Sequence, residues 1–124
     1  MQRKFRLTRS EDFKRVRRYG KSYAHPLMVL VVQANEETRL RGESSTQVRV
    51  GVAAGRIVGT AVKRNRAKRL LRAAMQPLFP EVASGWDVVL IARPALAVST
   101  LNETRQALIS LLQRSKLLAP SNAA

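Results

Sequence analysis

The chain has 124 residues, enough for one compact domain whose core needs no disulfide or metal ion. It contains no cysteine, which excludes a disulfide framework and thiolate metal sites. Lysine and arginine total 23 against 8 acidic residues, and the resulting net charge of +15 predicts a polyanionic partner, with nucleic acid the leading candidate and an anionic membrane surface the second.

The first predicted element is a basic helix over residues 7–20. Phe13 lies on its apolar face. Thr8 and Glu11 have the spacing of a capping box, in which a hydroxyl and a carboxylate satisfy backbone N–H groups at the start of a helix. Gly20 follows where a residue of left-handed conformation commonly ends a helix.

Three main strands are predicted next, over residues 25–33, 48–55 and 87–92. The polar segment between the first two is expected to be an exposed loop. Gly55 and Gly59 bracket a turn after the second strand.

A last helix is predicted to start at a second capping box, formed by Thr100 and Glu103, and residues 117–124 are expected to form a polar tail. The chain order of these elements predicts a single α/β (α+β) domain over residues 1–124, with an ordered core over about 5–116. Its order is α-β-β(-β)-α-β-α, in which the strand in parentheses is optional.

Two classes of function are disfavoured by what the sequence lacks. No apolar run is long enough for a signal-peptide core or a bilayer span, the longest being residues 27–32. Protein nucleases need clustered carboxylates for metal ions or paired acid–base groups, whereas the acidic residues here are scattered and His25 is the only histidine. We therefore expect a cytoplasmic protein with no membrane partner, no catalytic residue and no metal site of its own.

The most unusual segment is GTAVKRNRAKRLLRAAM, residues 59–75, which predicts an amphipathic helix with Thr60 as its N-cap. Each cation near a helix N-terminus opposes the macrodipole by a few tenths of a kcal/mol up to about 1. No acidic residue offsets Lys63 or Arg64 in the first turn. A basic run is usually just a solvated helix face, but this arrangement is unfavourable without an anion and well suited to bind phosphate.

The same segment resembles the protein subunit of bacterial ribonuclease P, whose hallmark is an Arg-Asn-Arg core followed by Lys-Arg and a further Arg. Here the matching residues are Arg64, Asn65, Arg66, Lys68, Arg69 and Arg72. FRLTRSEDFKRVRRYGKS is similar to the opening helix of the family, RVGVAAGRIVGTAV to the strand and turn before the motif, and DVVLIARP to the last strand. The resemblance covers most of residues 3–116 in the right order.

The resemblance implies a fold and a function. In this family the catalyst is a large RNA, and the small basic protein assists it in removing the 5′ leader of precursor tRNA. The expected partners are therefore the catalytic RNA and precursor tRNA, with Mg²⁺ bound mainly by the RNA and none by the protein, which alone is expected to be a monomer. The implied fold is a two-layer sandwich with a left-handed strand–helix–strand crossover, although general topology rules favour a right-handed one.

The resemblance also assigns two sets of binding residues. Contact with the catalytic RNA is assigned to Lys63, Arg64, Asn65, Arg66, Lys68, Arg69 and Arg72. A leader-binding cleft between the first helix and the sheet is assigned to Phe13, Arg9, Arg17, Val31, Arg56 and Thr60.

Three residues of the leader set depart from the family pattern. Arg17 stands where members often have an aromatic residue, Val31 where a tyrosine can occur, and Thr60 where Asn is frequent. With fewer rings to stack on bases, leader binding is expected to depend more on charge. Whether Tyr19 or Tyr23 replaces the missing rings stays open.

Alternative interpretations follow from the same residues. An apolar residue such as Phe13 on an amphipathic helix is commonly part of the core, so a leader contact is only one of its two interpretations. The alternatives to a ribonuclease P subunit are a generic RNA-binding module, such as a ribosomal-type protein, and a DNA-binding protein, although the order of helices and strands argues against helix-turn-helix recognition.

Overall fold

The computed structural model describes residues 6–7, 9–35, 48–83 and 85–119. In chain order the elements are α1 (Ser10–Tyr19), β1 (Lys21–Ala24), β2 (Met28–Ala34), β3 (Arg49–Ala53), the 3-10 turn η2 (Arg56–Val58), α3 (Ala61–Met75), η3 (Gln76–Glu81), β4 (Trp86–Ala92), η4 (Pro94–Val98) and α4 (Leu101–Arg114).

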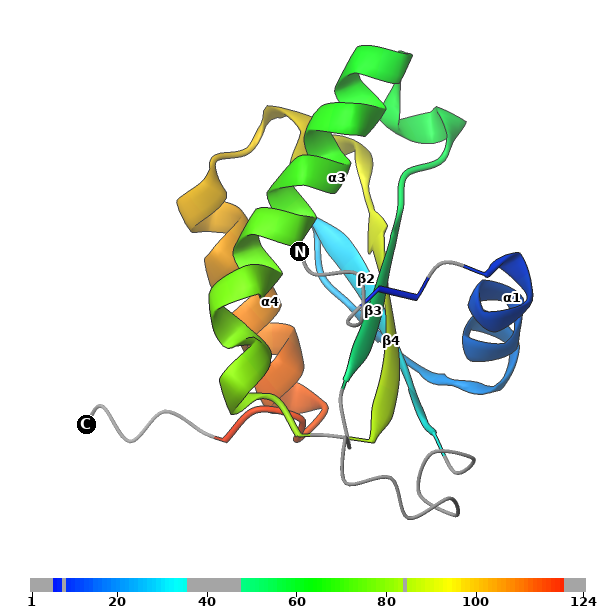
Figure 1. The fold of residues 1–124 in the computed structure, drawn as a ribbon. Helices are drawn as coiled ribbons and strands as arrows, with labels where there is room; N and C mark the ends of the chain where they lie inside the picture. The colour runs from blue at the N-terminus through cyan, green and yellow to red at the C-terminus, as the bar shows by residue number, and fades with distance from the viewer. Residues whose placement is uncertain (1–5, 8, 36–47, 84, 120–124) are drawn as a thin grey trace.

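The strands form one mixed sheet in the order β1-β2-β4-β3. β2 is antiparallel to both of its neighbours, whereas β3 runs parallel to β4. α3 connects these two parallel strands, and the crossover is left-handed (Figure 1), as the family resemblance implies and against the general rule. β1 and β3 are left as the two edges of the sheet.

Helices cover the two faces of this sheet unequally (Figure 1). α3 and α4 pack side by side on one face and complete the two-layer sandwich, while α1 lies across part of the other face. The larger apolar cluster fills the space between the sheet and α3 and α4, where Leu71 and Leu90 are fully buried. A smaller cluster under α1 consists of Leu7, Val16, Val31 and Val89.

Several predicted features are confirmed. Thr100 and Glu103 form the capping box at the start of α4, with Glu103 N donating to Thr100 Oγ1 at 3.1 Å and Thr100 N donating to Glu103 Oε1 at 2.9 Å. Gly55 and Gly59 bracket η2. Most of the predicted polar loop before β3, residues 36–47, lies outside the described residues.

The N-terminal prediction needs correction. The helix begins at Ser10 rather than at residue 7, because Leu7 N donates to Val50 O at 2.9 Å and so pairs with the edge of β3. Arg9 is the N-cap and makes no side-chain capping bond, and Thr8, the expected cap, lies outside the described residues. β1, which follows α1, was not among the main predicted strands, since it is short and mostly exposed.

Gly20 is required for a different reason from the one predicted. Its φ of −78° and ψ of 165° are extended, not left-handed. A Cβ at this position would lie 2.4 Å from Val16 O and 2.8 Å from Val32 O. The absence of a side chain therefore lets the end of α1 approach the backbone of β2.

The C-terminal boundary of the core also needs correction. Leu117 and Leu118, expected to begin the polar tail, are buried in the larger cluster. The chain turns back after α4 through Lys116, whose φ is 65°, and Leu117 N donates to Leu112 O at 3.0 Å. These are the features of a Schellman motif, here built without the glycine that usually marks it in a sequence.

Candidate nucleic-acid interface

α3 begins where the sequence predicted, and local chemistry fixes its start. Gly59 has φ of 133°, a conformation that favours glycine. Thr60 follows as the N-cap, and its Oγ1 accepts a hydrogen bond from Lys63 N at 3.3 Å. The first turn carries no acidic residue, so its cations face the positive end of the helix dipole without compensation from the helix.

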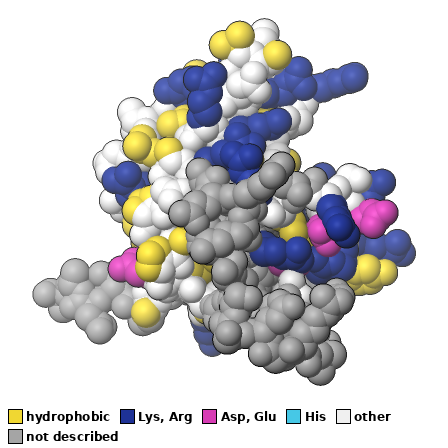
Figure 2. Space-filling view, viewed as in Figure 1, with side chains coloured by type: hydrophobic (Ala, Val, Ile, Leu, Met, Phe, Trp, Pro, Cys, Tyr) yellow, Lys and Arg dark blue, Asp and Glu magenta, His cyan; other side chains and the backbone are white. Residues whose placement is uncertain are grey.

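The basic residues of α3 lie on three sides of the helix rather than on one face. Asn65 and Arg69 are exposed and point away from the sheet, and Arg66 lies on the side next to η4 and α4. Figure 2 shows Lys and Arg side chains gathered over the upper half of α3, with the acidic side chains visible in this view lying elsewhere. The remaining side carries Arg64, Lys68 and Arg72, which are four residues apart and each half-buried.

The guanidinium of Arg66 is partly engaged in hydrogen bonds within the protein. Its guanidinium donates from Nη1 to Ala97 O at 2.5 Å and from Nη2 to Ser99 O at 3.0 Å. Ala97 lies in η4, and Ser99 lies between η4 and Thr100, the N-cap of α4. Arg66 therefore ties α3 to the start of α4, a contact that the assignment to RNA binding did not anticipate.

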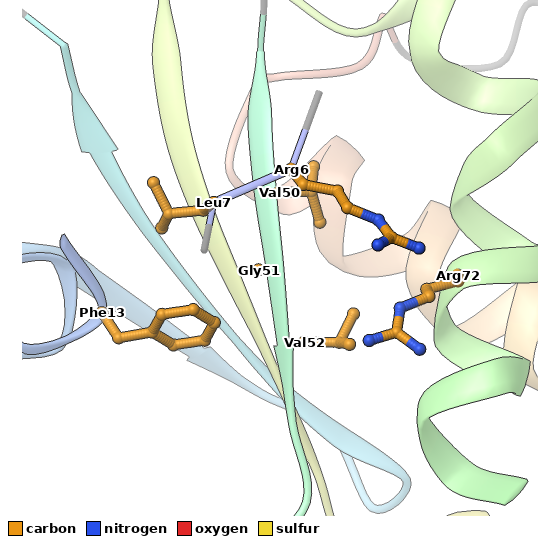
Figure 3. A pocket seen from close by; sticks show the side chains of 7 residues that line it. All are labelled: Arg6, Leu7, Phe13, Val50, Gly51, Val52 and Arg72. Atoms are coloured by element: carbon orange, nitrogen blue, oxygen red, sulfur yellow. The ribbon is translucent and has the colours of Figure 1, made fainter. Parts of the chain in front are cut away.

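Arg72 faces a pocket of about 220 Å³ at the edge of β3 (Figure 3). Arg6, from the N-terminal segment, extends its guanidinium into the same space, and the backbone and side chains of β3 form the wall. Burial lowers the pKa of Arg72, and the nearby charge of Arg6 lowers it further. Arg72 nevertheless stays protonated, since arginine keeps its proton in proteins. No acidic side chain lines this pocket among the described residues.

On the opposite face of the sheet, strand register aligns side chains in three rows. The rows are Gln33–Asp87–Arg49, Ser22–Val31–Val89–Gly51 and Ala24–Val29–Ile91–Ala53. The first row is polar, and the second contains the residues buried under α1. The third row is only partly buried, and it is referred to below as the open strip.

Phe13 stands beside this open strip. Its ring lies against Gly51, where a Cβ would come within 2.4 Å of Phe13 Cζ. The ring packs against the small cluster under α1 and is still half-exposed, so it has both a core contact and an accessible surface. Arg17, one helical turn later, is exposed.

The remaining residues assigned to leader binding differ in their exposure to solvent. Arg9, Arg56 and Thr60 are exposed, whereas Val31 is only 3% exposed because α1 covers it. Val31 is therefore not accessible in this structure, and its assignment as a contact residue stays a prediction. Val29, two residues earlier on the same face of β2, occupies the accessible position instead.

Neither of the two tyrosines lies in the open strip. Tyr23 pairs with Leu30, so its side chain is on the face covered by α3 and α4, where Arg114 lies over the ring at 6.0 Å. Tyr19, at the end of α1, is 67% exposed, with the Arg18 guanidinium 5.4 Å from the ring centroid. The open strip itself is aliphatic.

A buried ionic network, which sequence reasoning missed, fixes α1 on the sheet. Asp87 is fully buried; its Oδ2 accepts from Arg15 Nη2 at 2.5 Å, and Arg49 donates from Nε and Nη2 to its two carboxylate oxygens, both at 2.9 Å. Arg15 also donates to Gln33 and pairs with Asp12 on α1. Burial raises the pKa of Asp87, but the hydrogen bonds from Arg49 and Arg15 outweigh it and the net shift is downward. A carboxylate at the start of an otherwise apolar strand was the available signal, since buried charges need partners.

Residues 1–116 match the sequence model of the family described as Ribonuclease P. The chain belongs to the ribonuclease P family. It is 38% identical over 117 residues to the ribonuclease P protein component of Herpetosiphon aurantiacus, covering 94% of this chain and 89% of that one. It is 40% identical over 118 residues to the component from Symbiobacterium thermophilum, covering 95% and 96%.

Solved ribonuclease P proteins share the fold. The protein from Thermotoga maritima, in complex with 1-(4-fluorophenyl)-2-thiourea, is 26% identical with a TM-score of 0.73, covering 88% of this chain and 98% of that one. The protein from Staphylococcus aureus, at 24% identity, has a TM-score of 0.78 over 92% and 97% of the two chains.

One departure from the ribonuclease P family pattern has a local explanation. Thr60 stands where the resemblance led us to expect Asn, and its hydroxyl makes the N-cap bond that an Asn side chain also provides. Across the described ranges, no three His, Cys, Asp or Glu side chains are grouped so that they could hold a metal ion. None of the helices in those ranges has the length and apolar character needed to cross a membrane.

Proposed function

We propose that this chain is the protein component of a ribonuclease P, which binds the catalytic RNA and the 5′ leader of precursor tRNA and assists removal of that leader in the cytoplasm. The observation that carries the proposal is α3, a basic helix without an acidic residue in its first turn, in a chain of the ribonuclease P family. A generic RNA-binding module would share the charge but not the family match over residues 1–116.

α3 is the proposed contact with the catalytic RNA. Its N-terminal N–H groups, the positive end of its dipole and its guanidinium groups attract phosphate together. Asn65 and Arg69 point outward and are the first residues that a docking RNA would meet. Arg66 contributes mainly by holding α3 against α4, because its donors are engaged with Ala97 O and Ser99 O.

The open strip is the proposed leader site. Phe13 offers the ring beside it, and stacking of a single-stranded base on an aromatic side chain contributes about 1–3 kcal/mol. Val29 and Ile91 supply an aliphatic floor, while Arg9, Arg17 and Arg56 are exposed cations for the leader backbone. Mature tRNA lacks the leader, so this site would favour substrate over product.

The chemistry is proposed to belong to the RNA, with Mg²⁺ bound mainly by it. The protein, which alone is proposed to be a monomer, contributes positive charge where two polyanions must approach each other. Screening this repulsion lowers the concentration of Mg²⁺ needed for assembly and cleavage.

The direct test is cleavage of precursor tRNA by a bacterial ribonuclease P RNA at low Mg²⁺, with and without the protein. We expect marked stimulation by the protein, together with tighter binding of precursor than of mature tRNA by the assembled complex. No stimulation, or equal affinity for the two tRNAs, would refute the proposal.

A further inference from the structure

The pocket at the edge of β3 brings together two arginines, and none of the described residues that line it is acidic. Arg6 lies in the N-terminal segment and Arg72 near the end of α3, and both guanidinium groups project into the pocket (Figure 3). Two like charges held this close repel each other, and the field of Arg6 acts on Arg72.

One donor of this pair is unused among the described residues. Arg72 Nε is buried and has no hydrogen-bond partner among the residues that the structure describes. A buried donor without a partner is unfavourable, typically by about 1–3 kcal/mol, unless a ligand or water satisfies it. The pair therefore has the charge, one free buried donor and the space to accept an anion.

The edge of β3 supplies a further donor. Leu7 N donates to Val50 O, after which the chain leaves the edge and enters α1. Alternate residues of a parallel strand direct their backbone groups to the same side. Val52 therefore directs its N–H along the same edge, and it also lines the pocket.

We propose that Arg6 and Arg72 together bind one phosphate group of an RNA backbone at the edge of β3. The planar forks of two arginines suit the oxygens of a phosphate. The site is distinct from the outward face of α3 and from the open strip, and it lies between them: Phe13 lines the same pocket from the α1 side of β3. The identity of the anion as RNA rests on the proposed function, but the binding test below does not.

The first test uses the folded chain alone, with inorganic phosphate as the probe at constant ionic strength. In NMR spectra of the arginine Nε–Hε groups, the signals of Arg6 and Arg72 should shift saturably with phosphate and stay in place with chloride. Arg6→Ala should raise the phosphate concentration needed to shift the Arg72 signal by about tenfold, the loss expected for one charged hydrogen-bond partner. If Arg6→Ala does not fold, Arg6→Gln removes the charge and keeps the stem, and the same loss is expected.

The matched control is Arg18→Ala, which removes one charge from an exposed position on α1 and should change the titration less than twofold. Two results would overturn the site. One is a phosphate shift for Arg6 and Arg72 no larger than that of Arg18. The other is an unchanged Arg72 titration in Arg6→Ala, which would mean that the two arginines do not share an anion.

The second test identifies the source of the phosphate. If it belongs to the catalytic RNA, Arg6→Ala and Arg72→Ala weaken holoenzyme assembly. If it belongs to the leader, they weaken binding of precursor but not of mature tRNA by the assembled complex. Unchanged affinity in both arms would show that RNA does not use the site and would overturn the inference. Phosphate binding at the pair without stimulation of cleavage would instead refute the proposed function and leave the site standing.

Discussion

Neighbouring arginines of α3 have different tasks, although the sequence gives them the same charge. Arg66 donates to two backbone carbonyls before α4, while Arg69, three residues later, is exposed and makes no side-chain hydrogen bond to a described residue. The charge of both could be predicted from the sequence. The contacts of Arg66 could not, because its acceptors lie in η4 and directly after it, more than thirty residues away, and depend on how that turn packs against α3.

This difference predicts that alanine substitutions of the two arginines affect different properties: stability for Arg66 and RNA affinity for Arg69. Arg66→Ala should lower the free energy of unfolding by about 1–2 kcal/mol in the absence of RNA, because charged hydrogen bonds at a partly exposed site are lost. Arg69→Ala should change it by less than about 0.5 kcal/mol, while lowering the affinity for the catalytic RNA. Urea unfolding measures the first effect, and RNA titration the second. Equal stability of the two variants would contradict the assignment.

The close contact between Gly51 and the ring of Phe13 leads to a second prediction. An added Cβ would lie 2.4 Å from Phe13 Cζ, so Gly51→Ala must displace the ring from the sheet. We expect a loss of stability of about 1–3 kcal/mol, as for other overpacked sites, and weaker binding of the precursor leader. Gly55→Ala is the control, since a Cβ there meets nothing within 4 Å and its backbone is extended. A Gly51→Ala protein as stable as Gly55→Ala would show that the ring moves freely.

At the scale of elements, the amphipathic patterns predicted α3, α4 and the three main strands close to their observed positions. Such patterns report which side of an element is buried, but not which partner buries it. The start of α1 was misplaced because residue 7 pairs with β3 instead of continuing the helix. β1 was predicted only as an optional strand without bounds, because it is short and lies at an exposed edge of the sheet.

The position of α1 depends on Asp87, and this dependence predicts a pH effect. The pKa of Asp87 is lowered in the folded protein from its ordinary 3.8, so its carboxylate stabilises the fold fully above that value. The stabilisation is lost as the pH falls through the lower pKa of the folded state. Asp87→Asn should therefore cost about 3 kcal/mol at neutral pH, the low end for breaking a buried pair, since Arg15 and Arg49 each remain one-third exposed.

The difference in unfolding free energy between wild type and Asp87→Asn should be constant above about pH 5 and shrink below 3.8. Glu81→Gln removes one negative charge from an exposed position and is the matched control for the change in net charge. A difference that persists unchanged to low pH would mean that the amide substitution disrupts packing rather than the ionic network.

For the whole molecule, composition predicted the class of partner, and the basic segment of α3 predicted where part of the proposed contact lies. The open strip and the pocket at β3 could not be predicted in the same way. Each depends on register between strands that are distant in sequence: Val29 with Ile91, and Ile91 with Ala53. The pairing of Arg6 with Arg72 depends in addition on the N-terminal segment reaching the edge of β3.

The net charge of +15 raises the question of whether RNA binding depends on total charge or on where the charge lies. Lys68 and Arg69 lie on the proposed RNA-binding helix. Arg18, at the end of α1, and Lys21, in β1, lie near the β1 edge of the sheet, which is opposite the β3 edge. Replacing both residues of either pair by Ala lowers the net charge equally. If the charges on α3 contact phosphates, the slope of log affinity for the catalytic RNA against log salt concentration should fall by roughly 1 per residue in the first double variant. The second should keep the wild-type slope, because a distant charge contributes only a screened field. Equal slopes for the two double variants would show that binding responds to total charge, and the contact assigned to α3 would then be wrong.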